Sequence, residues 1–491
     1  MEKKRWFGLV AIALGVAGII VDATIVNVAI PVIFRDLKIT STQAQWIQET
    51  YTLIFASTLL LFGRMSDYLG RRRLFVLGVL IFVASSILAA NSGTGDFLIG
   101  MRLLQGLGGA MMLPTSLSLL NSTFEGKERG IAFAIWGSTI GGAAALGPLL
   151  GGWLTTNLSW RWAFGINLPL GVIVIIGTML FINESRGVNE KGVDYIGAFL
   201  SVLTMGSLVY ALIEGRNLGW WRTENGISRI PLFLLAFVIL LMVFIFIESK
   251  RNKAGKAVLL DLGLLSINSF RNGNIAAAIV SLGEFGLIFS LPLWMQNVLG
   301  YSAFKTGEVL LGLALGSFFA SGMSVGITKK VSIIRIVQAG IGLELVGVFL
   351  VGLLIASQVN IWKIIIGLFI YGMGVGLATA QLTNVVLKDV PVIQSGQASG
   401  MQSTARQLGS ALGIAILGTT FFTSFGKNLG NLSGAKELVK TAGVTISQLP
   451  APANQVARDA LSHAASTSAY VAAIFLLAGF IATLTLGRRA N

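Results

Sequence analysis

Unbroken apolar runs recur along this chain, and they limit its possible folds more than any other feature. Roughly 20 apolar residues in a helix cross the bilayer core. The chain has 491 residues, of which 54% are hydrophobic and 12% are charged. An average soluble domain carries about twice that share of charge. Because the runs lack the alternation of barrel strands, and lipid admits only helices or closed barrels, we predict an all-α integral membrane protein.

Fourteen such spans can be placed along the sequence. They lie near 6–30, 44–63, 74–92, 97–121, 129–156, 162–183, 194–213, 230–248, 272–296, 306–328, 333–356, 361–386, 395–423 and 467–487. With an even number of crossings, both termini lie on one side. Of the 36 Lys and Arg residues, 22 fall on the side of the N-terminus and 12 on the other. We therefore expect a multi-pass protein of a bacterial cytoplasmic membrane with both termini in the cytoplasm.

Several classes of chemistry are excluded by the composition. The net charge is +15, which could suggest a nucleic-acid partner. The Lys and Arg residues lie in short loops between apolar runs, however, where they indicate membrane topology. Cysteine is absent and His463 is the only histidine, so we expect no metal site and no histidine relay. Gly255-Lys256 lacks the rest of a P-loop, and the glycine clusters 106–109 and 372–376 lie inside apolar spans. We expect no cofactor, no enzyme activity and no nucleotide motor, so transport would run on a gradient.

Charged residues inside the predicted spans are the first candidates for function. They are Asp22, Glu49, Arg102, Glu284 and Arg406. A charge at this depth costs several kcal/mol, so it is kept for a reason. A desolvated carboxylate favours protonation and a nearby arginine opposes it, and a reversible proton carrier needs this balance. We favour a functional role for Asp22, leave Glu49 and Glu284 open between function and structure, and expect the arginines to face a carboxylate or a cavity.

A sixth intramembrane charge, Glu344, and the loop after the second span are read differently. For Glu344 we favour a structural role, with the carboxylate paired or snorkelling. In the loop, Gly63 and Gly70 permit a tight reversal, and Asp67 can accept hydrogen bonds from a helix N-terminus or pair with an arginine. Such a charged clasp could hold one face of a transporter shut. The alternative is that Arg71 and Arg72 only anchor topology.

Two other segments are notable. In the fifth span, the small residues Gly137, Gly141 and Ala145 share one helix face. Pro148, in the run that also holds Gly147 and Gly151, bends the helix, which suits a gate or simple close packing. The longest polar stretch, 424–466, is expected to form a flexible external loop.

Five segments in order resemble the major facilitator superfamily, and specifically its fourteen-helix drug:proton antiporter family. They are Asp22–Pro31, Gly63–Arg72, Arg102–Ala110, Gly137–Gly152 and Trp160–Pro169. The second half departs from the pattern: its equivalent of the loop motif is reduced to Thr328-Lys329-Lys330, without acid or glycine. Glu49 is also not part of the general family pattern.

The resemblance implies two six-helix bundles, at 1–185 and 257–491, with two additional helices in 186–256. It implies that Asp22 and Arg102 form a proton-linked pair and that Asp67, Arg71 and Arg72 form a cytoplasmic clasp. Glu49, a departure from the pattern, is a further candidate for coupling or substrate binding in this protein. Gly63, Gly70, Gly147, Pro148 and Gly151 would belong to the gates. Substrate would meet Asp22, Glu49, Glu284 and Arg406.

The resemblance favours a proton-coupled antiporter that exports amphipathic, often cationic, drugs, with protons, a small molecule and the bilayer as its partners. An acid in an aromatic and apolar cavity attracts lipophilic cations without strict geometry. The first alternative is an exporter dedicated to one metabolite, amino acid, siderophore or lipid. A non-transporting membrane scaffold or sensor is a minor alternative.

Overall fold

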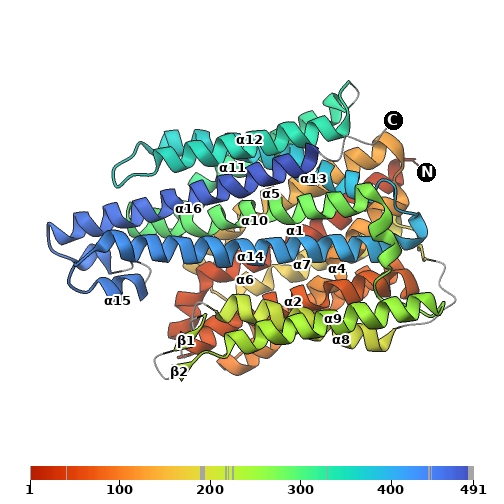
Figure 1. Cartoon of the computed structure of the whole chain (residues 1–491), viewed down its shortest axis with the longest axis horizontal. Coiled ribbons are helices and arrows are strands. Elements are labelled where there is room, and N and C mark those ends of the chain that lie inside the picture. The colour runs from red at the N-terminus through yellow and green to blue at the C-terminus, as the bar shows by residue number, and fades with distance from the viewer. Residues whose placement is uncertain are drawn as a thin grey trace.

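The computed structural model describes residues 2–39, 41–187, 194–215, 218, 220–223, 226–328, 330–440, 443 and 445–484. Helices dominate this part of the chain and run nearly parallel along its long axis (Figure 1). The first seven are α1 Glu2–Asp36, α2 Ser41–Leu69, α3 Arg71–Ala90, α4 Gly95–Thr123, α5 Gly126–Asn157, α6 Trp162–Gly165 and α7 Asn167–Phe181. Next come α8 Tyr195–Glu214, the short strands β1 Arg222–Thr223 and β2 Gly226–Ile227, and α9 Ile230–Lys253.

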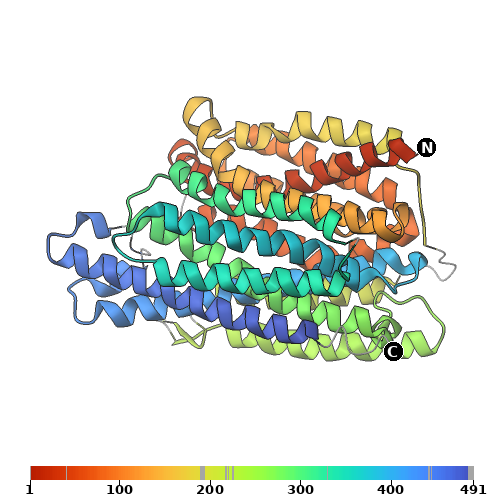
Figure 2. The same ribbon diagram turned by 90° about the horizontal axis from the view of Figure 1, so that it is seen from above.

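The second half follows a short 3-10 turn at Leu262–Ser266. Its helices are α10 Asn268–Asn297, α11 Ala303–Ile327, α12 Ile333–Leu354, α13 Ile361–Leu387, α14 Ser395–Leu429, α15 Ala435–Lys440 and α16 Ala453–Leu484. Seen from above, the helices of residues 1–187 and those of residues 268–484 form two neighbouring groups (Figure 2). Helix α1 begins and α16 ends at the same end of the molecule, which we call the termini end (Figures 1 and 2).

Eleven helical segments of the described residues are long and apolar enough to cross a membrane. Helices α2, α5 and α10 are not among these eleven, although they have 29, 32 and 30 residues. Helices α2 and α5 lie at the junction of the two groups, where α2 packs against α14 and α5 packs against α11 and α13. Helix α10 packs between α14 and α16 within the second group.

The pair α8 and α9 lies along α2 on the outside of the molecule (Figure 1). Trp46 of α2 stacks on Tyr210 of α8 at 6.4 Å, and Tyr210 contacts Phe233 of α9 at 4.3 Å between ring centroids. The opposite face of α9 is strongly apolar and exposed, for example at Leu232 and Phe246. Such a face suits contact with lipid.

The predicted loop 424–466 is wrong in its extent and in its irregularity. Helix α14 continues to Leu429, α16 already begins at Ala453, and the short α15 lies between them. The first turns of α16 bury small side chains, such as Ala457, Ala460 and Ala464. These small residues pack closely although their hydropathy is low, so the polar composition concealed a helix.

Candidate functional site

Asp22 lies at the centre of a fully buried polar cluster inside the first group of helices. Its carboxylate forms an ion pair with Arg102 of α4, and both side chains are almost completely shielded from solvent. Gln105 Nε2 and Asn167 Nδ2 donate to Asp22 Oδ1 at 3.0 and 2.9 Å. Ser86 of α3 accepts from the same two amides at 2.7 and 3.1 Å. The acid from α1 is thus held by donors from α4 and α7.

Arg102 is held from its other side by α2. Its Nε donates to the carbonyl oxygen of Ile47 at 3.0 Å, and its Nη1 donates to Gln105 Oε1 at 2.9 Å. The guanidinium carbon lies 4.3 Å from the ring centroid of Tyr51, a distance that favours a cation–π contact. The arginine therefore has partners on α2 and α4 besides the carboxylate of Asp22.

The chain segment before α7 fixes the end of α1. Trp160 Nε1 and Arg161 Nη1 donate to Asp36 Oδ2 at 2.8 and 2.7 Å. These hydrogen bonds hold the pKa of the exposed Asp36 carboxyl below its ordinary value. The same segment carries Asn167, so the Trp160–Pro169 motif ties one end of α1 and supplies a donor to Asp22.

A second buried acid, Glu284 of α10, lies in the other group of helices. Thr379 Oγ1 of α13 donates to its Oε1 at 3.0 Å, and Arg406 Nη2 of α14 lies 3.6 Å from its Oε2. Tyr371 donates its hydroxyl to the backbone carbonyl of Glu284 at 3.1 Å. Arg406 is partly exposed, so this pair is less enclosed than Asp22 and Arg102.

Two other acids lie outside these hydrogen-bonded clusters, although the charges of Glu284 and Arg406 act on Glu344. Glu49 lies half-buried on α2, where its charge interacts with Tyr210 of α8. Glu344 corrects our expectation, since it neither snorkels nor pairs. It is fully buried on α12, and neither carboxylate oxygen has a hydrogen-bond partner among the described residues. The Glu344 side chain fits against Gly374 of α13 because the glycine has no side chain: a Cβ on Gly374 would stand 2.6 Å from Glu344 Cγ.

Asp67 joins the two groups of helices at the termini end. Its Oδ1 and Oδ2 accept from the backbone N–H groups of Gly396 and Gln397 at 3.0 and 2.9 Å, in the first turn of α14. Arg71 Nη2 lies 2.8 Å from Asp67 Oδ1 and donates to the carbonyl oxygen of Val392 at 2.6 Å. Both alternatives left open for the acid therefore occur together: a helix N-terminus and an arginine.

Burial and backbone geometry support this clasp of Asp67, Arg71 and the start of α14. Burial raises the pKa of the Asp67 carboxyl and outweighs the opposing effect of Arg71 and the two amides. Its charged form therefore depends on these donors. Gly63 leaves no room for a side chain against Gly400, which brings α2 onto α14. Gly70 has φ 105° in the turn before α3, a conformation that favours glycine.

Glu184 caps the start of α3, next to the same turn. Its carboxylate accepts from the backbone N–H groups of Arg72 and Arg73 at 3.0 and 3.1 Å, at the start of α3. Arg72 also donates to the carbonyl oxygen of Ile182 at 3.1 Å. Arg72 therefore fastens α3 to the end of α7 and not to Asp67. Sequence reasoning missed Glu184, although an acid facing a helix start is a usual capping pattern.

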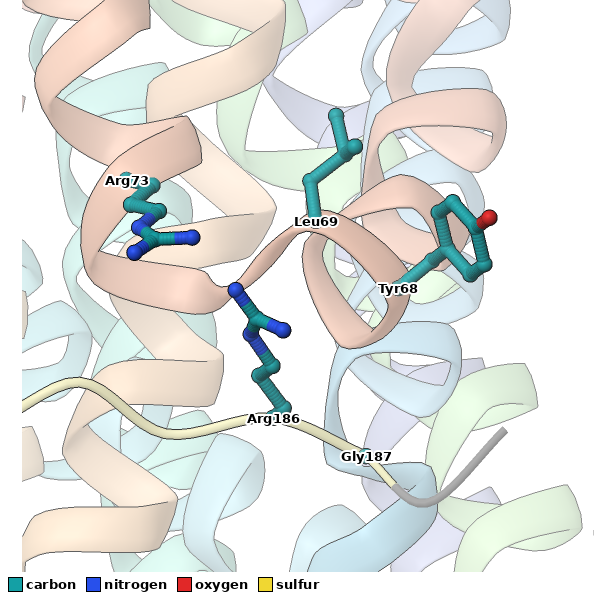
Figure 3. A pocket seen from close by; sticks show the side chains of 5 residues that line it. All are labelled: Tyr68, Leu69, Arg73, Arg186 and Gly187. Carbon is teal, nitrogen blue, oxygen red and sulfur yellow. The ribbon is translucent and has the colours of Figure 1, made fainter. Parts of the chain in front are cut away.

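A small cavity of 420 Å³ lies beside the clasp, between the α2–α3 turn and the segment after α7 (Figure 3). Tyr68, Leu69, Arg73, Arg186 and Gly187 line it. Arg186 extends from that segment toward the turn, with Arg73 on the neighbouring helix (Figure 3). This end of the molecule therefore carries positive charge around a closed contact.

Helices α1 and α5 approach closely at two of the predicted glycines. A Cβ on Gly147 would overlap Thr24 Oγ1, and a Cβ on Gly151 would stand 2.8 Å from Ile25 Cγ1. Pro148 lies inside α5, but its side chain is outside the described part. These glycines set the distance between α5 and the helix that carries Asp22.

Replacing Gly147 by Ala should destabilise the protein by about 1–3 kcal/mol, because the added methyl group must displace Thr24 from α1. The thermal unfolding midpoint of the purified variant would measure this. Gly142→Ala is the matched control on the same helix, since a Cβ there meets nothing within 4 Å. Equal midpoints for the two variants would show that the close approach is unimportant.

Comparisons with known proteins agree with this arrangement. A family model described as "Major Facilitator Superfamily" matches residues 12–414. The probable actinorhodin transporter of Streptomyces coelicolor is 32% identical over 86% of this chain and 73% of that protein. The multidrug efflux pump LfrA of Mycolicibacterium smegmatis is 30% identical over 97% and 95%. The crystal structure of the human organic anion transporter MFSD10 covers 98% of this chain and 99% of that one, with a TM-score of 0.62 and 14% identity, and shows the shared fold.

Proposed function

This chain belongs to the major facilitator superfamily, and from that premise we propose that it is a proton-coupled antiporter exporting lipophilic, often cationic, compounds. Transport and not enzymatic catalysis is the activity of this family. The relatives named as a multidrug efflux pump and as a puromycin resistance protein support export of small toxic compounds. The match to the efflux pump runs along nearly the whole of both chains.

The observation that carries the proposal is the enclosed pair of Asp22 and Arg102. A buried ion pair gains little stability over apolar packing, so its presence calls for another reason. When Asp22 binds a proton, its attraction to Arg102 falls and α1 is free to shift against α4. When the proton leaves, the ion pair forms again. This alternation couples a proton to the rocking of the two groups of helices.

We assign substrate binding to Glu284 with Arg406, and to Glu49 as a further candidate. The carboxylate of Glu284 keeps a weak, 3.6 Å contact to a partly exposed arginine, so a cation can compete for it. Asp22 has no solvent exposure in this conformation. Its contact with substrate would require a state in which α1 has moved.

The topology is part of the same proposal. Fourteen crossings would include α2, α5 and α10, with bundles at 1–185 and 257–491 and the pair α8 and α9 between them. The termini end would face the cytoplasm of a bacterial cell, because most Lys and Arg residues lie there. The Asp67 clasp would then close the cytoplasmic side of the transporter.

We expect purified protein in vesicles to move ethidium against its gradient when a pH difference is imposed. The movement should stop when an added protonophore collapses that pH difference. Fluorescence of the dye follows the movement, and empty vesicles are the control. The dedicated exporter is the second candidate, because one relative is named for the single compound actinorhodin. No movement for any member of a panel of cationic dyes would reject the broad specificity and favour that second candidate.

A further inference from the structure

A second cavity, larger than the one beside the Asp67 clasp, lies at the termini end. Its volume is 960 Å³, and the ends of five helices surround it: the starts of α5, α10 and α12 and the ends of α11 and α13. The export mechanism uses none of its lining side chains. It is large enough for a ligand and not only for water.

The lining is basic. Lys127, Arg129, Arg271 and Lys388 face the cavity together with a single acid, Asp389. Among the described residues, none of the four basic side chains forms an ion pair. A cavity with this excess of positive charge attracts an anion.

The hydrogen bonds of the two arginines leave this charge uncompensated. Arg129 donates to amide oxygens only, those of Asn384 at 3.1 Å and Asn121 at 3.2 Å. Arg271 donates to Asn268, Asn272 and a backbone carbonyl. These neutral acceptors orient both guanidinium groups without cancelling their charge. Asp389 and Glu125 act on Arg129 only through space.

Comparison with the Asp67 clasp shows what is missing here. There, Asp67 in the last turn of α2 accepts from the first turn of α14. Here, the cavity separates the α11–α12 turn from Gly126 and Lys127 at the start of α5. That turn, residues 328–332, contains no acid in its sequence. The acids at the start of α5 are its own Glu125 and Glu128, and Glu128 is paired with Arg5. No acid reaches this helix start from the α11–α12 turn across the cavity, whereas Asp67 reaches α14 in the clasp.

We propose that this cavity binds the phosphate group of an anionic phospholipid, which supplies the negative charge that the turn lacks. The helix ends place the basic groups at the level of lipid headgroups in the membrane orientation proposed above. Ile333, Ile334 and Val385 give the cavity an apolar side that suits a lipid better than a free ion. The lipid closes the seam between α5 and the α11–α12 turn.

The test is a lipid titration of delipidated, detergent-solubilised full-length protein, followed by native mass spectrometry. We expect phosphatidylglycerol to bind more tightly than phosphatidylcholine and to raise the thermal unfolding midpoint. The double variant Lys127→Gln/Lys388→Gln should bind phosphatidylglycerol about tenfold more weakly. Both lysines are exposed and have no partner to lose, so the variant should fold. The Arg double variant, Lys127→Arg/Lys388→Arg, should restore the affinity.

The matched control is Lys363→Gln/Lys436→Gln, which removes the same charge from exposed lysines at the opposite end of the molecule. Equal loss in both double variants, or equal binding of the two lipids, would overturn the proposal. Glycerol 3-phosphate binding as tightly as the lipid would instead assign the cavity to a soluble phosphate. The assay uses neither drug nor pH difference, so its failure leaves the export proposal untouched.

Discussion

Replacing Asp22 by Asn should reduce proton-driven export to the level of empty vesicles. The amide cannot exchange a proton, so the alternation between ion pair and neutral pair is lost. Exchange of substrate between the two sides without a pH difference should survive, because that movement needs no proton. Dye transport in vesicles, measured with and without an imposed pH difference, separates these two activities.

The stability of this variant must be measured with it. Asp22→Asn leaves Arg102 buried without a counter-ion, which typically costs about 3–5 kcal/mol. The remaining contacts of Arg102 to Ile47, Gln105 and Tyr51 reduce that cost. The double variant Asp22→Asn/Arg102→Gln removes both charges, so it should regain stability while coupling stays absent. Return of coupling in the double variant would contradict the proposed role of the pair.

Asp36→Asn is the matched control, with the same substitution on the same helix. Asp36 is about half exposed and pairs with Arg161 at 2.7 Å. Exposed ion pairs contribute little stability, and the amide oxygen of the substituted side chain can still accept from Trp160 and Arg161. Export by this variant should match the unmodified protein. Full export by Asp22→Asn under the same conditions would reject Asp22 as the proton carrier.

Many of the helices could be predicted because a helix that contacts lipid must be apolar along about 20 residues, and such runs are visible in the sequence. The spans lie within a few residues of α3, α4, α8, α9, α12 and α13. The predicted starts of α2 and α5 also lie within a few residues of the observed ones. The region 424–466 was misjudged, because the rule that equates low hydropathy with a loop fails for helices that pack through alanine and serine, as α16 does at Ala457 and Ser462.

The candidate site was predictable as single residues but not as clusters. A charge in an apolar run is visible in the sequence, so Asp22, Arg102, Glu284 and Arg406 were found. Their neutral partners were not, because Gln105, Asn167 and Thr379 are ordinary polar residues until the fold brings them within hydrogen-bond distance. Glu344 shows the opposite failure: partners were expected for it, and none is present among the described residues.

The termini end also shows what a sequence can say about contacts between halves. The loop motif identified Asp67 and Arg71, but its target was invisible because the N–H groups of Gly396 and Gln397 carry no side-chain signature. More than 300 residues separate donor and acceptor along the chain, as the separation of 329 between Asp67 and Gly396 shows. Only the packing of α2 against α14, through Gly63 and Gly400, brings them together.

The clasp therefore makes a second strong prediction, that Asp67→Asn shifts the transporter toward the state open at the termini end. The variant loses the charge that holds Arg71 and one acceptor for the α14 amides. Charge-assisted hydrogen bonds of this kind contribute about 1.5–3 kcal/mol each, so the closed state should become about tenfold or more less populated. Cysteine labelling at positions buried between α4 and α14 in the closed state can report the shift directly, since the chain has no cysteine of its own.

Ser118→Cys is a suitable reporter, because Ser118 is fully buried and lies 3.2 Å from Ser395 across the seam in the closed state. Its labelling rate with a membrane-impermeant maleimide should rise in the Asp67→Asn background, while transport falls. Asp261→Asn is the control: this acid lies at the same end and accepts from Gln394 at 2.9 Å, but it contacts neither Arg71 nor the first amides of α14. If the clasp determines the closed state, removing its charge must increase the labelling rate. An unchanged labelling rate in Asp67→Asn would therefore mean that other contacts hold α4 and α14 together.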